Sequence, residues 1–119
     1  TKRRVFFQDK ALKISSGEHT IQMDDDKIEL TAGDSRITME KDRICLRQGK
    51  TELLLNAKGV YIKAGDSEMA LNEQGILGKT GKEIGWDAQG AVNIAGRGNV
   101  NVQAKGSPLS LGGSVVNIG

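Results

Sequence analysis

Apolar side chains recur along this chain in pairs two residues apart, and a new pair arrives about every eight residues. Because strand side chains alternate between the two faces of a sheet, this pattern predicts short strands with one buried face. The intervening residues are mostly polar, but Phe6, Leu54, Tyr61 and Leu77 are apolar and mark outward apolar patches or local adjustments. The first nine pairs are Val5/Phe7, Leu12/Ile14, Ile21/Met23, Ile28/Leu30, Ile37/Met39, Ile44/Leu46, Leu53/Leu55, Val60/Ile62 and Met69/Leu71.

The step between pairs changes along the chain. From Val5 to Met69 the pairs begin alternately seven and nine residues apart, whereas past Ile76 the step is eight as far as Val100. Continued to the end, the pattern predicts about fifteen strands and an elongated stack roughly 70 Å long. Five glycines stand sixteen residues apart in the longer connectors and predict sharp corners: Gly17, Gly33, Gly49, Gly65 and Gly81.

Composition narrows the class of protein. A chain of 119 residues with 37% hydrophobic residues predicts a single domain over 1–119, and its four aromatic residues predict a thin core. Lys and Arg alternate with Asp and Glu, and the net charge of +2 gives no sign of a nucleic-acid-binding surface. The single Cys45 excludes an intrachain disulfide and fits a reducing compartment, and no apolar run approaches eighteen residues.

Two topologies fit the spacing of the apolar pairs. One chain winding as a roll would place two strands in each sixteen-residue turn and would stack the glycines in a column. Three chains wrapped around one axis would instead form a triangular prism, in which the strand above each strand comes from a neighbouring chain. The mean spacing between pairs stays at eight residues although the alternation of seven and nine ends near Ile76, and this favours the prism.

Several segments carry a resemblance to a known family: 28–30, 60–64, 92–94, 100–104 and the closing 116–119. Together they resemble the C-terminal needle of VgrG (valine-glycine repeat) spike proteins of type VI secretion, and the related central spikes of contractile phage tails. The sequence does not separate a secretion spike from a phage spike. The resemblance covers nearly the whole chain and rests on a degenerate octad.

The resemblance implies an all-β fold, an intertwined homotrimeric triple-stranded β-helix that forms a triangular prism needle. It implies no enzyme activity, cofactor or metal, and a rod that a contractile sheath pushes from the bacterial cytoplasm into a target envelope. The trimer core would be Ile21, Met23, Ile28, Leu30, Ile37, Met39, Ile44, Leu46, Leu53, Leu55, Val60, Ile62, Met69, Leu71, Val92, Ile94, Val100 and Val102.

Partners also follow from the resemblance. A PAAR-type tip protein would cap the end at Val116, Asn117 and Ile118, and the rod would carry secreted effectors. Because the chain enters its repeat almost at Thr1, we expect a fragment whose preceding part meets the tube protein. The histidine-containing iron site of some phage spikes is not expected, because the single His19 lies far from the C-terminus.

Alternative readings remain open. Phage tail-spike rods that degrade polysaccharides place acids, Arg and Tyr on outer grooves, and Tyr61, Arg43, Glu40 and Asp42 fit such roles. A single-chain β-roll adhesin is a second alternative. The acidic run 24–26 is interpreted as a solvated corner rather than a cation site, because Lys27 follows it directly.

Overall fold

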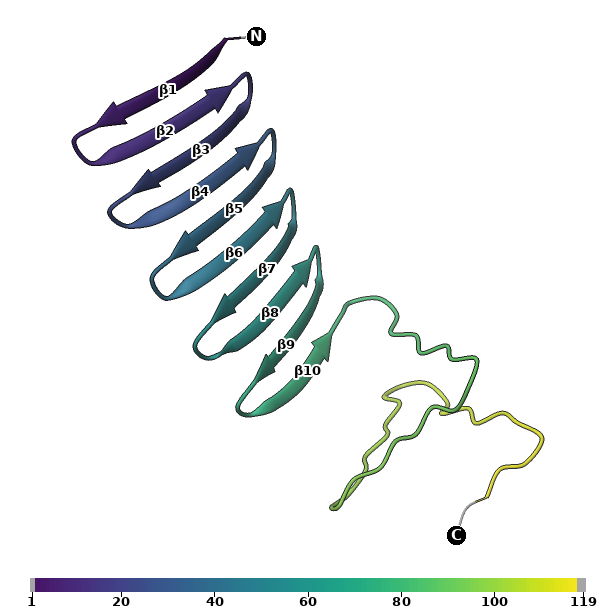
Figure 1. Ribbon diagram of the computed structural model, residues 1–119. Helices are drawn as coiled ribbons and strands as arrows, with labels where there is room; N and C mark the ends of the chain where they lie inside the picture. Colours follow the sequence, from purple (N-terminus) through teal and green to yellow (C-terminus); the bar gives the residue numbers. More distant parts are fainter. Residues whose placement is uncertain (1, 118–119) are drawn as a thin grey trace. The chain divides into compact units, whose positions relative to one another are not determined.

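Ten antiparallel strands form one continuous sheet in the computed structural model, which describes residues 2–117 (Figure 1). Thr1, Ile118 and Gly119 lie outside the described residues. The strands are β1 (Arg3–Gln8), β2 (Ala11–Ser16), β3 (His19–Asp24), β4 (Lys27–Ala32), β5 (Ser35–Glu40), β6 (Arg43–Gln48), β7 (Thr51–Asn56), β8 (Gly59–Ala64), β9 (Ser67–Asn72) and β10 (Gly75–Lys79).

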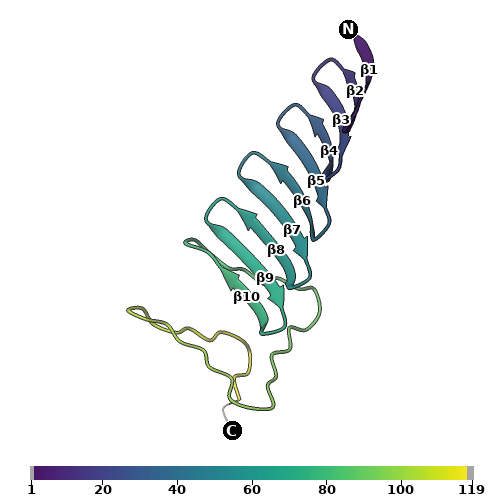
Figure 2. The ribbon, with the colours of Figure 1, turned by 90° about the vertical axis from the view of Figure 1, so that its left-hand side faces the viewer.

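The sheet is a simple meander, because each strand pairs with the strand before it and the strand after it in the sequence. Two residues join each strand to the next, so strand and turn together make a unit of eight. Figure 2 shows the strands as successive rungs of a single layer. The elongated all-β fold predicted from the sequence is confirmed, and each of the nine listed apolar pairs lies within a strand.

Glycine turns line one long edge of the sheet. Gly17, Gly33, Gly49 and Gly65 each open a two-residue turn with a φ of 61°, 58°, 54° and 59°. No other described residue type has a positive φ, so only the first turn position needs the left-handed region, as in a type II′ hairpin. The predicted corner role is therefore confirmed for these four glycines, whereas Gly81 follows the last strand and has no such φ.

Side-chain amides and carboxylates close several turns along the opposite edge. The Asp24 Oδ1 accepts hydrogen bonds from the backbone N–H groups of Asp26 and Lys27, both at 3.0 Å. Asn56 and Asn72 accept equivalent bonds from the residues two positions later, at 2.9 Å in each case. These are Asx turns, in which neither of the two turn residues has a positive φ, although Gly59 and Gly75, which follow the Asn56 and Asn72 turns, have φ values of 154° and 135°. The acidic run 24–26 is thus a corner, as the sequence predicted.

The alternating step of seven and nine has a geometric cause. Within each antiparallel strand pair, the numbers of two facing residues always add up to the same value. Ile21 of β3 therefore faces Leu30 of β4, and Leu30 in turn faces Ile37 of β5. Each turn therefore reverses the order of the residues that share a face. As a result, their spacing along the sequence alternates between seven and nine residues. This register places the apolar pairs of β1 to β9, together with Ile76 of β10, on one face of the sheet.

Two sequence predictions need correction. Strands were expected to pair with neighbouring chains, but those of the sheet pair with one another within the chain, because two-residue turns return each strand beside the last. About fifteen strands were expected, but no helix or strand occurs among described residues after Lys79. Contacts divide the chain there, with one unit ending at Ile84 and another starting at Gly85. The pairs at Val92/Ile94 and Val100/Val102 lie in this second unit.

Candidate assembly interface

One face of the ten-stranded sheet is apolar over its whole length. We call it the apolar face and define it by two columns of side chains. The column along the middle of the strands is Val5, Ile14, Ile21, Leu30, Ile37, Leu46, Leu53, Ile62 and Met69. The column beside the Asx turns is Phe7, Leu12, Met23, Ile28, Met39, Ile44, Leu55, Val60, Leu71 and Ile76.

No second layer of strands covers this face within the sheet unit. Ile37 and Ile44 lie in central strands, yet 38% and 39% of their surface is exposed. Among the described residues, no side chain of any kind is buried. A single sheet layer has no second layer against which to pack, and domains bury apolar faces by packing two or more layers. The apolar face is therefore a candidate assembly interface.

The fourteen core positions predicted between Ile21 and Leu71 all lie on the apolar face. The other four, Val92, Ile94, Val100 and Val102, lie outside the sheet and are 51% to 76% exposed. Val116 and Asn117, predicted to bind a tip protein, lie in the second unit without regular structure. The third predicted tip residue, Ile118, lies outside the described residues.

A third column on this face, beside the glycine turns, consists mostly of small and polar residues. It holds Ser35 and Gln48, which are joined by a side-chain hydrogen bond, and Ser67, which lies 2.8 Å from Thr80. The same edge carries a backbone bond of 3.3 Å from Gly65 N–H to the Lys50 carbonyl, which links two neighbouring turns. The apolar surface is thus displaced toward the Asx edge.

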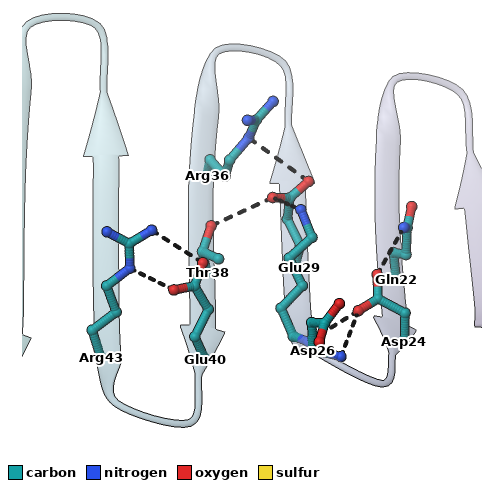
Figure 3. A network of polar contacts seen from close by, with 9 residues as sticks. Gln22, Asp24, Asp26, Glu29, Arg36, Thr38, Glu40 and Arg43 are labelled. Carbon is teal, nitrogen blue, oxygen red and sulfur yellow. Dashed lines mark hydrogen bonds and ion pairs between the residues drawn. The ribbon is translucent and has the colours of Figure 1, made fainter.

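The opposite face carries ion pairs along its strands, shown in part in Figure 3. Glu29 lies at the centre of the group, with Lys27 Nζ at 3.3 Å and Arg36 Nε at 3.9 Å. Glu40 accepts two bonds from Arg43, at 2.5 and 3.1 Å. This bidentate pair lowers the pKa of Glu40 and raises that of Arg43. Such a charged face suits contact with water.

The residues proposed for a polysaccharide-degrading site do not form one group. Arg43 and Glu40 bind each other, and Asp42 lies in the turn between their strands. Tyr61 lies on β8, two strands from Arg43. In the described part of the chain, no three His, Cys, Asp or Glu side chains gather as metal ligands. Residues 2–117 also contain no helix long and apolar enough to cross a membrane.

The Asx turns were not predicted, although the sequence carried a signal for them. Asp24, Asn56 and Asn72 all occupy the last strand position before a turn and differ in number by multiples of sixteen. Cys45, the single cysteine, lies on the charged face, where it pairs with Leu54.

Comparisons with known proteins give a likeness of fold. No protein-family model and no curated protein matches the sequence. Among solved structures, a chain from "Structure of PdpA-VgrG Complex, Lidless" matches with a TM-score of 0.65 and 16% identity, covering 92% of this chain and 99% of that one. At this identity the likeness shows the fold alone. Since β10 ends at Lys79, coverage of 92% also includes much of the second unit.

Asp24 gives a testable pH dependence. Its backbone bonds from Asp26 and Lys27 lower its pKa, so its stabilising effect is complete above the ordinary Asp pKa of about 3.9 and is lost as pH falls through the lowered value. Asp24→Asn keeps the Oδ1 acceptor found at Asn56 and Asn72 but cannot titrate. We expect wild type to melt above Asp24→Asn at pH 7, by a margin that begins to shrink near pH 4 and is lost as the pH falls through the lowered pKa of Asp24.

Asp24→Ala is the matched control, because it removes the acceptor altogether. We expect it to melt below Asp24→Asn at every pH. Thermal melting followed by circular dichroism between pH 2 and pH 7 checks all three proteins. A difference between wild type and Asp24→Asn that stays constant with pH would show that the carboxylate is not closing the turn.

Proposed function

We propose that this chain is the needle segment of a membrane-puncturing spike in a contractile injection machine of the type VI secretion kind. Three copies would form the needle, with their apolar faces turned toward a common axis. The observation that carries the proposal is the apolar face, which extends over ten strands and has no cover within the chain. The fold shared with a chain of a PdpA–VgrG complex supports the same reading.

The width of the sheet supports three copies. Strands of six residues span roughly 20 Å, so a triangle built from three such sheets has its axis about 6 Å from each face. Apolar side chains fill a gap of that size, since sheets that pack face to face lie about 10 Å apart. Four sheets around one axis would leave about 10 Å from each face to the centre, and therefore an unfilled channel.

The second unit supports an intertwined arrangement beyond the sheet. Its apolar pairs at Val92/Ile94 and Val100/Val102 continue the step of eight that runs from Ile76 to Val100, whereas an antiparallel meander requires seven and nine in alternation. Beyond Val100 the steps are nine, to Leu109, and seven, to Val116, so this argument applies to the part of the unit before Leu109. A step of eight from one strand to the next shifts each strand by the same number of residues without reversing its direction. This is the relation between parallel strands that stack in register. Parallel neighbours within one chain need a crossover of a dozen or more residues, which a step of eight does not provide.

Backbone pairing in this unit leads to the same proposal. Among described residues 85–117, no backbone N–H group bonds to a backbone carbonyl of the chain. Backbone polar groups that leave water need partners. A chain that advances eight residues and moves to the next side of a triangular prism would place strands of the other two copies above and below its own. The meander would thus continue into a chain-exchanged β-helix.

A needle of this kind acts mechanically. Its strands would be hydrogen-bonded along the whole rod and its apolar side chains would fill the axis, so axial force from a sheath would reach the tip without bending it. No bond is made or broken by this segment in our proposal. The end at Val116 and Asn117 would receive a PAAR-type tip, effectors would travel with the rod, and the protein would pass from the bacterial cytoplasm into the target envelope.

Substitution of an inward residue tests the assembly. We expect Ile37→Asp to prevent trimer formation, because it places three carboxylates without partners around one apolar axis. Ile44→Asp should act in the same way. Carried in the full-length protein, either change should also abolish delivery into target cells. Assembly is measured by sedimentation velocity, and delivery by killing of target cells in mixed culture.

The matched control is Thr38→Asp, which places the same charge one residue away on the opposite face. We expect Thr38→Asp to form trimers and to support delivery. Normal trimers from both Ile37→Asp and Ile44→Asp would mean that the apolar face does not point inward. Normal trimers without any delivery by Thr38→Asp would argue against a purely mechanical role.

Hydrogen exchange tests the chain-exchanged segment. In the assembled protein we expect backbone amides within residues 85–117 to exchange as slowly as those of β3–β9, because neighbouring copies would supply the missing carbonyl partners. The amides of Asp25, Lys41 and Asp42, which lie in turns, provide a fast-exchanging reference in the same molecule. Exchange of the whole 85–117 segment at the rate of these turns would exclude interchain strand pairing there.

A further inference from the structure

The charges of the sheet divide into those on the strands and those in the turns. Every ion pair of the described residues joins side chains within strands, such as Arg43 with Glu40. The charged residues of the two-residue turns take part in none of these pairs. They line both long edges of the sheet and are Asp9, Lys10, Glu18, Asp25, Asp26, Asp34, Lys41, Asp42, Lys50, Lys58, Asp66 and Glu73.

A three-fold needle would bring the two edges of the sheet together. If three copies surround one axis, as proposed above, rotation places the glycine edge of one copy beside the Asx edge of the next. Rotation does not shift a copy along the axis. Turns of the glycine edge follow β2, β4, β6 and β8, whereas turns of the Asx edge follow β1, β3, β5, β7 and β9 (Figure 1). With strands perpendicular to the axis, each glycine turn therefore lies at a level midway between two turns of the neighbouring copy.

Open hollows lie between successive turns at both edges. On the glycine edge, a hollow of about 490 Å³ is lined in part by Lys50 and Asp66, which belong to successive turns. On the Asx edge, a hollow of about 590 Å³ is lined in part by Asp42 and Lys58. The first hollow lies at the level of Lys58 in the neighbouring copy, and the second at the level of Lys50. Each edge thus has room where the other edge would place a charged turn.

The signs of the turn charges distinguish the two turns that a glycine turn could meet. The charged residue of each glycine turn is its second residue. In the turn one level nearer β1, the closer residue is likewise the second. This contact gives three combinations of opposite charge and one of like charge: Glu18 with Lys10, Lys50 with Asp42, Asp66 with Lys58, and Asp34 with Asp26.

The contact with the turn one level nearer β10 is less favourable. There the closer residue is the first of its turn. This contact gives one combination of opposite charge, two of like charge and one with an uncharged residue: Asp34 with Lys41, Glu18 with Asp25, Asp66 with Glu73, and Lys50 with Ala57. Charge complementarity therefore selects the contact nearer β1.

The matching charges cannot meet within one chain. Lys58 precedes β8 and Asp66 follows it, so a strand of six residues, roughly 20 Å long, separates the two side chains. The members of the other two matching pairs lie in the same way at opposite ends of β2 and of β6. Contact between copies is the arrangement in which these charges pair.

We propose that neighbouring copies are joined along their edges by three interchain ion pairs: Glu18 with Lys10, Lys50 with Asp42, and Asp66 with Lys58. The proposal rests on the three-fold assembly proposed above and adds the level at which the copies meet. Electrostatic complementarity sets register and suppresses wrong pairings more than it adds affinity. A copy shifted toward the other contact would bring Asp66 against Glu73 instead.

Charge reversal in the full chain tests one of these pairs. Lys58→Glu places like charges at all three contacts between copies, and the double variant Lys58→Glu/Asp66→Lys restores opposite charges with exchanged signs. In urea and low salt, where exposed charges are little screened, we expect Lys58→Glu to raise the dissociation constant of the trimer at least about tenfold. The double variant should return to the wild-type constant. Sedimentation velocity measures the share of trimer.

Two further variants test the level of contact. Lys41→Glu is the matched control, because Lys41 has an opposite partner only in the contact nearer β10, and this change should not raise the dissociation constant. Asp26→Lys converts the one like-charged combination, with Asp34, into an opposite pair. We expect Asp26→Lys to lower the dissociation constant.

Mixed assembly shows whether the pair joins different chains. Lys58→Glu and Asp66→Lys are unfolded together in urea and refolded, with a purification tag on one of them. Only contacts between the two kinds of chain join opposite charges at this pair, so mixed trimers should exceed the share that random mixing gives. Native mass spectrometry counts the chains of each kind.

Other outcomes overturn the proposal in distinguishable ways. A wild-type chain that is monomeric removes the proposed function on which the ion pairs rest. A wild-type trimer that is unchanged by Lys58→Glu and mixes at random excludes the ion pairs and leaves the spike intact. Weakening by Lys41→Glu without weakening by Lys58→Glu would assign the contact nearer β10. A double variant that stays as weak as Lys58→Glu would exclude pairing of residues 58 and 66.

Discussion

The whole structure depends on covering an apolar face that one chain cannot cover for itself. The meander places two columns of Val, Ile, Leu, Met and Phe side chains on one side of a single layer, where many remain more than a third exposed. Full burial of such a side chain contributes about 1.5 to 3 kcal/mol, so the gain from enclosing both columns is large. Flat sheets of many strands are also unusual unless other layers stack on them. In the proposed needle, assembly would supply the second layer that this face lacks.

Turn chemistry determines where that face lies. Two-residue turns at both edges keep the repeat at eight, and glycines at one edge and Asx residues at the other reverse the chain without moving the register. A slip of one residue in any strand would send its apolar pair to the charged face. The same precision aligns the ion pairs of Arg47 with Glu52 and Arg43 with Glu40 on that face. Turns of two residues therefore determine which side chains lie on the apolar face, on the charged face and at the two edges of the sheet.

Much of the fold could be predicted from the sequence, because a period of two within each strand and of eight between strands leaves little freedom. The apolar pairs located every strand, and Gly17, Gly33, Gly49 and Gly65 located one edge. The pairing of strands was missed because the alternating step of seven and nine was averaged to eight, although that alternation is the mark of an antiparallel reflection. The pairs at Val92 and Val100 have the same composition as the earlier ones but no partner in their own chain, which composition cannot reveal. The apolar residues of the charged face were visible in the sequence only as scattered exceptions, Leu54, Tyr61 and Leu77, until the register placed them in one column.

The central claim is that copies of this chain cover one another's apolar faces around a three-fold axis. Multi-angle light scattering of the purified chain measures this most directly, because it gives the mass of the assembly independently of its elongated shape. With a chain of 12.7 kDa, the account predicts a single species of about 38 kDa that does not dissociate on dilution. A mass of one chain would contradict it outright, and a mass of two chains would replace the triangular needle with a two-layer sandwich.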